Sequence, residues 1–257
     1  MALMIPQLNQ DQLDAIQSPA EATLYVSLRD RLPDGFEVYH SVGWILKRNE
    51  SMARDGETDF VICHSDHGFL TIEVKGGGIG YDADFDEWHS IDTRDRKHVI
   101  KDPVRQALGA KYSILNKLRE HPRWYQTGIG RILCGHAVFF PDIGNPARTQ
   151  KSDLPMTIIG SSADLDDPVK WLTSVFDYWR GESEQTDPLS TSGMRLFSEI
   201  FGRSFEVKPM LSKTLSQEEA KRIKLTSEQA RILDTLRSRR RAAISGGAGT
   251  GKTLLGV

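Results

Sequence analysis

The sequence contains little cysteine and no long hydrophobic run. Its 257 residues include two cysteines, Cys63 and Cys134, which argues against a disulfide framework; both lie in apolar segments typical of a packed core. No apolar stretch approaches the ~20 residues that span a bilayer. The opening residues, MALMIPQLNQ, lack the length and the basic start of a signal peptide. We therefore expect a cytoplasmic protein without membrane contact.

The formal net charge is only −2, but the charges are unevenly distributed along the chain. Residues 214–257 carry nine Lys and Arg against four Asp and Glu, a net of +5, which leaves −7 for residues 1–213. Such an asymmetry indicates two regions with different roles. Because an acidic body repels phosphates, any nucleic-acid contact there must be local or mediated by a metal ion.

Hydrophobic periodicity predicts an α/β domain with a mixed sheet. One helix should begin after Ser18, with Pro19 at its first position, and another after Asp102, with Pro103 at its first position. Further helices are expected over residues 168–180 and 194–202. Strands are expected over residues 36–46, 58–64, 68–75, 131–140 and 155–160, with a more polar hairpin over 78–91.

One predicted hairpin carries charged residues inside apolar strands. The stretch GETDFVICHSDHGFLTIEVKGGG, residues 56–78, contains Asp59, Glu73 and Lys75. Strand side chains alternate between faces, so these three share one face. The other face, the predicted core face, has Phe60, Ile62, Leu70, Ile72 and Val74. For the three to lie together, odd-numbered residues of one strand must lie opposite odd-numbered residues of the other. This pairing requires a connection of three residues or a bulge near Asp66. We therefore predict such a connection, with Asp59 opposite Glu73 or Lys75.

Adjacent carboxylates on rigid strands favour a bound cation. Two such groups repel each other unless a cation lies between them, and hard oxygen ligands suit Mg²⁺ or Mn²⁺. A neighbouring lysine can assist an attacking water and offset charge in the transition state. This combination favours phosphodiester hydrolysis. The alternative interpretation is a solvated strand face with a Glu–Lys pair.

The same stretch resembles the core motif of the nuclease-related domain (NERD) family of the PD-(D/E)XK nuclease superfamily. The resemblance covers Ser18 to about Leu165 and implies a restriction-endonuclease-like mixed sheet flanked by helices. It implies that Asp59, Glu73 and Lys75 form the catalytic set, that Asp59, Glu73 and Glu21 bind Mg²⁺ or Mn²⁺, and that Gln106 supports the site. The activity implied is that of a metal-dependent deoxyribonuclease, with DNA as the partner.

Several of these residues also have simpler interpretations. Glu21 follows Ser18 by three positions, which is the spacing of a capping box. Gln106 is alternatively a solvent-facing helix residue. Related recombination-type nucleases often carry Q-x-x-x-Y, whereas Ala110 stands at the fourth position after Gln106 here. Glu57 is assigned to the surface, at the turn before its strand.

A phosphate-binding loop follows an apolar strand near the end of the sequence. GGAGTGKT matches G-x-x-x-x-G-K-[ST], in which backbone N–H groups cradle phosphates, the lysine reaches the outer phosphates and the threonine holds Mg²⁺. The upstream LTSEQARIL resembles the Q motif of UvrD-like superfamily 1 helicases, with a glutamine that reads adenine. The ATP-binding residues implied are Gln229, Gly246, Gly249, Gly251, Lys252 and Thr253.

We therefore expect a nuclease-like domain over residues 1–205, a linker over 206–224, and an incomplete P-loop ATPase segment over 225–257. Because the sequence ends at Val257, soon after the loop, we expect an N-terminal part of a nuclease–helicase fusion without helicase activity of its own. Such a fusion would act in DNA processing or in defence against foreign DNA. Further partners would be the remainder of the helicase domain and a second copy of the chain.

Two alternative functions stay open at this point. The first is a DNA-binding module that recruits DNA to a motor without cutting it. The second is an ATP-binding regulatory fragment in which the phosphate loop is the functional element. Metal-dependent cleavage distinguishes the nuclease from the first alternative, and nucleotide affinity that depends on Lys252 would support the second.

Overall fold

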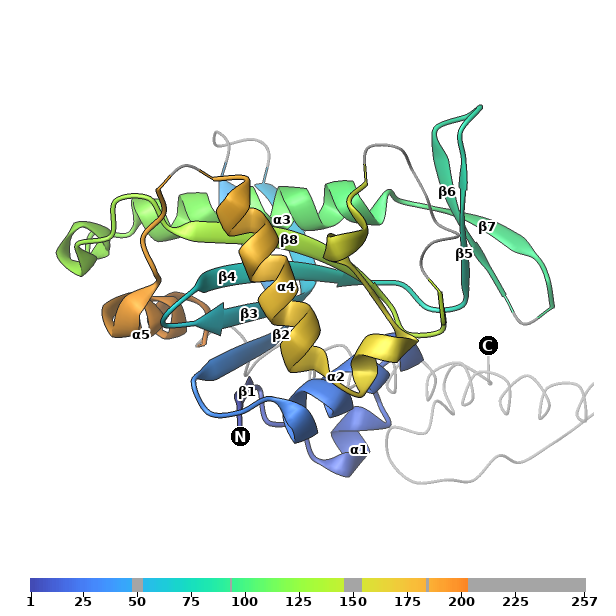
Figure 1. The fold of residues 1–257 in the computed structure, drawn as a ribbon, viewed down its shortest axis with the longest axis horizontal. Coiled ribbons are helices and arrows are strands. Elements are labelled where there is room, and N and C mark those ends of the chain that lie inside the picture. The colour runs from blue at the N-terminus through green and yellow to red at the C-terminus, as the bar shows by residue number, and fades with distance from the viewer. Residues whose placement is uncertain (48–52, 93, 146–153, 184, 203–257) are drawn as a thin grey trace, which may run out of the picture. The chain divides into compact units, whose positions relative to one another are not determined.

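The computed structural model describes residues 1–47, 53–92, 94–145, 154–183 and 185–202 (Figure 1). These residues lie within one compact unit and form a mixed α/β structure. Its main sheet has six strands in the order β1-β2-β3-β4-β8-β9. Strands β2, β3 and β4 are antiparallel to their neighbours in this group, whereas β1 runs parallel to β2, and β8 runs parallel to β4 and β9. The predicted mixed sheet is therefore confirmed.

The strands of the main sheet are β1 (Leu3–Ile5), β2 (Phe36–Lys47), β3 (Ala53–His64), β4 (Gly68–Val74), β8 (Leu133–Phe140) and β9 (Ile159–Ser161). The strands predicted over 36–46, 58–64, 68–75 and 131–140 are confirmed, although β3 begins earlier than predicted. The strand predicted over 155–160 is confirmed only for its last two residues, because Met156–Ile158 form a short 3-10 helix. The short strand β1 and the short helix α1 (Gln10–Leu13) were not predicted, because neither segment is long enough to show a hydrophobic period.

Helices cover both faces of the main sheet. Helices α2 (Pro19–Arg31) and α4 (Pro168–Gly181) pack on the face that bears Phe60, Ile62, Leu70 and Ile72. Helices α3 (Pro103–Glu120) and α5 (Ser190–Phe201) pack on the face that bears Val61, Cys63 and Phe69. Figure 1 shows α4 crossing the near side of the sheet. The predicted core face is confirmed, but the opposite face is also buried over most of its length, so it is not a solvated face.

The hairpin of β3 and β4 has the predicted connection. The turn consists of Ser65–His67, three residues, and it pairs odd residues with odd residues, as in Val61 with Thr71. The same register, continued along the strands, places Asp59 opposite Glu73. The ladder itself runs from the Cys63–Phe69 pair to the Phe60–Ile72 pair.

The predicted polar hairpin is part of a second sheet. It has three strands in the order β5-β6-β7, which are β5 (Gly78–Asp82), β6 (Glu87–Ile91) and β7 (Lys97–Ile100). Strand β7 was missed because its short sequence, KHVI, has no clear apolar alternation. Figure 1 shows this sheet projecting from one end of the main sheet.

Helix starts follow the expected capping chemistry. Asp102 caps α3 by accepting hydrogen bonds from the backbone N–H groups of Val104 and Arg105, at 2.9 and 3.0 Å. Ser18 caps α2 in the same way, and Pro19 is the first residue of the helix. Among the helices of the described ranges, none has both the length and the apolar character needed to cross a membrane.

Candidate active site

The pairing of β3 with both of its neighbouring strands is interrupted at Asp59. On one side, the ladder between β3 and β4 ends at the Phe60–Ile72 pair. On the other side, the ladder between β2 and β3 passes from the His40–Phe60 pair to the Val42–Thr58 pair. Ser41, which faces Asp59 in this register, has a φ of 56°, in the left-handed region that is uncommon for residues other than glycine. Backbone distortion of this kind concentrates at functional sites.

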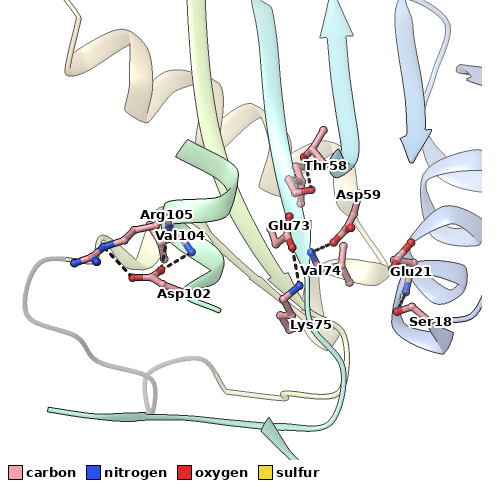
Figure 2. Close-up of polar contacts among 11 residues, drawn as sticks. Ser18, Glu21, Thr58, Asp59, Glu73, Val74, Lys75, Asp102, Val104 and Arg105 are labelled. Atoms are coloured by element: carbon pink, nitrogen blue, oxygen red, sulfur yellow. Dashed lines mark hydrogen bonds and ion pairs between the residues drawn. The ribbon is translucent and has the colours of Figure 1, made fainter. Parts of the chain in front are cut away.

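Side chains bridge the opening between β3 and β4. The Oδ2 atom of Asp59 accepts a hydrogen bond from the backbone N–H of Val74, at 2.7 Å (Figure 2). The hydroxyl of Thr58 lies 3.5 Å from the carbonyl oxygen of Ile72, at the limit of a hydrogen bond. Because the Asp59 carboxylate takes over a contact normally made by a strand backbone, its position is fixed by the fold.

Glu73 and Lys75 form an ion pair beside Asp59. Glu73 is only 3% exposed, and its Oε1 atom lies 2.6 Å from Nζ of Lys75. The backbone N–H of Lys75 donates to the carbonyl oxygen of Phe139 on β8, which continues the hydrogen bonding of β4 past its last residue. Three predicted residues, Asp59, Glu73 and Lys75, are therefore brought together as the register predicted.

Glu21 turns toward the sheet and away from its own helix cap. The backbone N–H of Glu21 donates to the hydroxyl of Ser18 at 3.3 Å, which is one half of the predicted capping box. The carboxylate does not complete the box: its Oε2 atom lies 3.3 Å from Nε2 of His40 on β2. In the view of Figure 2, Asp59 lies between Glu73 and Glu21. The capping-box interpretation is thus half right, because only the backbone of Glu21 takes part in the cap.

The carboxylates affect one another's ionisation. Burial raises the pKa of Asp59 to about 8, and the negative charges of Glu73 and Glu21 add to this effect, against the opposing influence of the Val74 N–H and Lys75. Burial also raises the pKa of Glu73, while Lys75 lowers it and Glu21 and Glu57 raise it. The site therefore concentrates negative charge that a nearby cation would relieve.

Gln106 lies where α3 crosses β4. The carbonyl oxygen of its neighbour Ala107 accepts a hydrogen bond from the hydroxyl of Thr71 at 2.8 Å. Thr71 lies two residues before Glu73 on β4, and therefore on the same face. The Oε1 atom of Gln106 is buried and has no hydrogen-bond partner among the described residues. Gln106 is therefore partly buried, and its amide oxygen does not face solvent.

The glycines after Lys75 allow the backbone to turn sharply, close to α2, at the end of β4. A Cβ atom on Gly76 would lie 3.0 Å from Cβ of Ala20, in the first turn of α2. Gly77 has a φ of 79°, and its backbone N–H donates to Oδ2 of Asp142 at 2.7 Å. Asp142, which follows β8, therefore holds the segment next to Lys75. Asp142 was not predicted because it lies 65 positions from Gly77 in the sequence.

Glu57 was predicted at the turn before its strand, and this position is wrong. It lies within β3, not at a turn before it, because β3 begins at Ala53. Its Oε1 atom accepts a hydrogen bond from the hydroxyl of Ser41 at 2.8 Å. Although Glu57 is exposed, as predicted, its charge raises the pKa of Glu73.

A family model matches the part of the chain that carries the candidate site. Residues 17–141 match the NERD family model, described as a nuclease-related domain. The NERD match runs from just before α2 to just after β8, so it includes Glu21, Asp59, Glu73, Lys75 and Gln106. Searches of curated proteins and of solved structures gave no match to the chain.

The match does not extend to the predicted ATPase segment. The residues assigned to ATP binding lie outside the described residues: Gln229, Gly246, Gly249, Gly251, Lys252 and Thr253. The domain boundaries at 205 and 224 also fall there, so these assignments stay predictions.

The donor set fits a hard divalent cation. Within the described ranges, no three His, Cys, Asp or Glu side chains converge as a ready-made metal site. Mg²⁺, however, is commonly held through one or two carboxylates, with waters and substrate phosphates completing its shell. Asp59 and Glu73 supply two such carboxylates, each with one oxygen already engaged by Val74 or Lys75. A cation would be held through their other oxygens.

Proposed function

We propose that this chain is a Mg²⁺- or Mn²⁺-dependent deoxyribonuclease. Its active site, in which phosphodiester bonds are hydrolysed, would consist of Asp59, Glu73 and Lys75. One observation carries the proposal. The carboxylates of Asp59 and Glu73, which repel each other, lie beside the ammonium group of Lys75 at the point where the ladder between β3 and β4 ends. The NERD match over residues 17–141 supports a nuclease-related role for the same region.

In this proposal, Asp59 and Glu73 hold the metal ion and Glu21 adds negative charge beside it. When bound, the metal would lower the pKa of a water molecule and neutralise charge on the phosphate. The carboxylates are suited to this task because the fold, and not the ligand, fixes their positions. Asp59 is tied to the backbone of β4, and Glu73 is buried in the sheet.

Lys75 contributes the positive charge of the site. Its Nζ atom is held by Glu73 at 2.6 Å, and its side chain is half-buried. An ammonium group has three donors, so Lys75 can keep the contact with Glu73 while it donates to a phosphate oxygen or to the attacking water. It would thereby orient the nucleophile and stabilise the charge that develops in the transition state.

The test is cleavage of labelled single-stranded and duplex DNA by the purified chain in Mg²⁺, in Mn²⁺ and in EDTA. We expect cutting that requires the metal and is abolished by Lys75→Ala. Lys170→Ala, an exposed lysine on α4, serves as the matched control and should cut normally. Binding of DNA without cutting in any metal would contradict the proposal and would favour a non-cleaving module that recruits DNA.

We further propose that residues 225–257 begin a P-loop ATPase of a nuclease–helicase fusion that acts in DNA processing or defence. The sequence GGAGTGKT, with Lys252 and Thr253 placed for phosphates and Mg²⁺, is what supports this. Nucleotide binding that is lost in Lys252→Ala would support the assignment. Equal nucleotide affinity in both proteins, or none in either, would contradict it.

A further inference from the structure

His40 lies buried between the elements that carry Glu21 and Asp59. On β2, it pairs with Phe60 of β3 directly before the interruption at Asp59. Its ring centroid lies 4.9 Å from that of Phe60 and 5.5 Å from that of Tyr25, which is on α2, one turn after Glu21. Only 7% of His40 is exposed. The imidazole therefore contacts both α2, which carries Glu21, and β3, which carries Asp59.

The rings around His40 are themselves held in place. Tyr25 and Phe60 are both fully buried. The hydroxyl of Tyr25 donates a hydrogen bond to the carbonyl oxygen of Pro6 at 2.8 Å and accepts one from the backbone N–H of Leu8 at 3.0 Å. Close packing in a core holds side chains in defined rotamers. The orientation of the imidazole is therefore determined by the fold before any ligand binds.

The imidazole contacts the carboxylate of Glu21. The Nε2 atom of His40 lies 3.3 Å from Oε2 of Glu21. Because an ionised carboxylate accepts hydrogen bonds but cannot donate them, Nε2 carries the hydrogen in this contact. Among the groups that the structure describes, His40 is the one hydrogen-bond partner of this carboxylate. The direction in which the Glu21 side chain points therefore depends on His40.

Glu21 needs such a partner because the neighbouring carboxylates repel it. Its negative charge raises the pKa of both Asp59 and Glu73, so the three groups lie close enough to interact. A glutamate side chain can rotate about several bonds, and like charges favour the rotamers that separate them. The hydrogen bond from His40 opposes this separation. Carboxylates that ligate metal ions are commonly held by a second group in this way.

We propose that His40 is a positioning residue of the metal site. Its Nε2–H group holds the Glu21 carboxylate beside Asp59, so that Glu21 joins Asp59 and Glu73 in binding the cation. This inference rests on the proposed function for the presence of the cation. His40 itself contacts neither the metal ion nor DNA. Its effect on the site passes through Glu21, whereas the packing of its ring contributes to stability, and substitutions can separate the two contributions.

The experiment measures the affinity of the DNA-free chain for Mn²⁺, with electron paramagnetic resonance to measure the unbound ion. His40→Phe keeps a packed ring and removes the donor, whereas His40→Gln restores an amide N–H near the position of Nε2. We expect His40→Phe to weaken Mn²⁺ binding roughly 10- to 100-fold, the range for groups that hold metal ligands in position, and His40→Gln to retain most of the affinity. His98→Phe is the matched control, because His98 contacts Asp92 at 3.2 Å on the β5–β7 sheet. Its Mn²⁺ affinity should equal that of the parent.

A double variant shows whether His40 acts through Glu21. If it does, Glu21→Gln weakens Mn²⁺ binding at least as much as His40→Phe, and the combined variant binds no more weakly than Glu21→Gln alone. Thermal melts establish that each variant is folded. His40→Leu is a second variant without a donor, and its smaller side chain fits where a phenyl ring does not.

Three results would overturn the proposal. The first is parental Mn²⁺ affinity in a folded His40→Phe or His40→Leu chain. The second is a His40→Gln chain that binds Mn²⁺ as weakly as His40→Phe. The third is a combined variant in which the two effects multiply, since His40 and Glu21 would then act independently. If Asp59→Asn still abolishes Mn²⁺ binding, each of these results leaves the proposed nuclease intact. A parent chain without a Mn²⁺ site would overturn the proposed function and, with it, the role of His40.

Discussion

Asp59 accepts a hydrogen bond from the backbone N–H of Val74 at 2.7 Å, at the point where the ladder between their strands has ended. This contact makes the carboxylate part of the fold as well as part of the site. The same hydrogen bond lowers the pKa of Asp59, but burial and the charges of Glu73 and Glu21 outweigh it. The fold therefore holds in place a group that would be more easily ionised in water.

This raised pKa predicts that stability in EDTA falls as pH rises. The pKa of Asp59 is about 8 in the folded chain against an ordinary 3.8, so between these values the folded state keeps a proton that the unfolded state has lost. The stabilisation by this proton is complete below the pKa of the unfolded state and disappears as the pH approaches the pKa of the folded state. Between the two pKa values, the free energy of unfolding falls by at most about 1.4 kcal/mol per pH unit. Urea unfolding at about pH 5 and about pH 8 measures it.

Asp59→Asn is the matched variant for this prediction, since the amide does not titrate. It should lose less stability than the parent between the two pH values. An identical pH dependence in both proteins would show that Asp59 ionises normally. Mg²⁺ should reduce the loss in the parent alone, because a bound cation favours the ionised carboxylate.

The two roles considered for Glu21 can be separated by mutation. Ser18→Ala removes the cap of α2 and should cost about 1 kcal/mol of unfolding free energy, with cleavage largely retained. Glu21→Ala keeps the backbone N–H that bonds to Ser18, so it should change stability little and slow cleavage strongly. Thermal melts and cleavage rates of both variants provide the comparison. Equal cleavage by Glu21→Ala and the parent would leave Glu21 outside the site.

Local sequence predicted the parts of this site that depend on one hairpin. Side chains alternate between the two faces along β3 and β4, and the turn between the strands has an odd number of residues. These two features were enough to place Asp59 and Glu73 on the same face, opposite each other. The parts that depend on distant segments were not predictable. Asp142 meets Gly77 across 65 residues, and His40 meets Glu21 across 19.

The same limit applies to burial and to backbone distortion. Gln106 has a polar side chain in an otherwise regular helix, and nothing in its neighbours reveals that Oε1 is buried. Ser41 sits in an ordinary strand sequence, and its left-handed φ becomes visible only when β2 and β3 are paired. Periodicity describes which face a residue occupies, but not what covers that face.

Asp142 should act on cleavage through the position of Lys75. Asp142→Ala removes the acceptor of the Gly77 N–H and should cost about 1 kcal/mol of stability. A displacement of about 1 Å at Lys75 can slow the chemical step up to about 100-fold. Asp142→Asn keeps an acceptor oxygen and should retain most of the activity. If Asp142→Ala cut DNA at the parental rate, its role would be confined to stability.

Gln106→Leu distinguishes a structural from a functional glutamine. Since Oε1 is buried without a partner, replacing the amide with an apolar side chain should leave stability unchanged or raise it by about 1 kcal/mol. If Gln106 supports the site, cleavage should nevertheless fall roughly 10- to 100-fold, which is the range for residues that hold metal ligands in position. Unfolding midpoints and cleavage rates are compared in one preparation. Normal cleavage by a stable Gln106→Leu chain would exclude a role for it.

The most direct test of the proposed metal site is a titration of the nucleotide-free chain with Mn²⁺. Electron paramagnetic resonance measures the concentration of the unbound ion. We predict a saturable Mn²⁺ site that is lost in Asp59→Asn and retained in Glu182→Gln, an exposed acid at the end of α4 that serves as the control. That result would establish the paired carboxylates as the metal site. Equal Mn²⁺ binding by the parent and by folded Asp59→Asn would contradict the central claim.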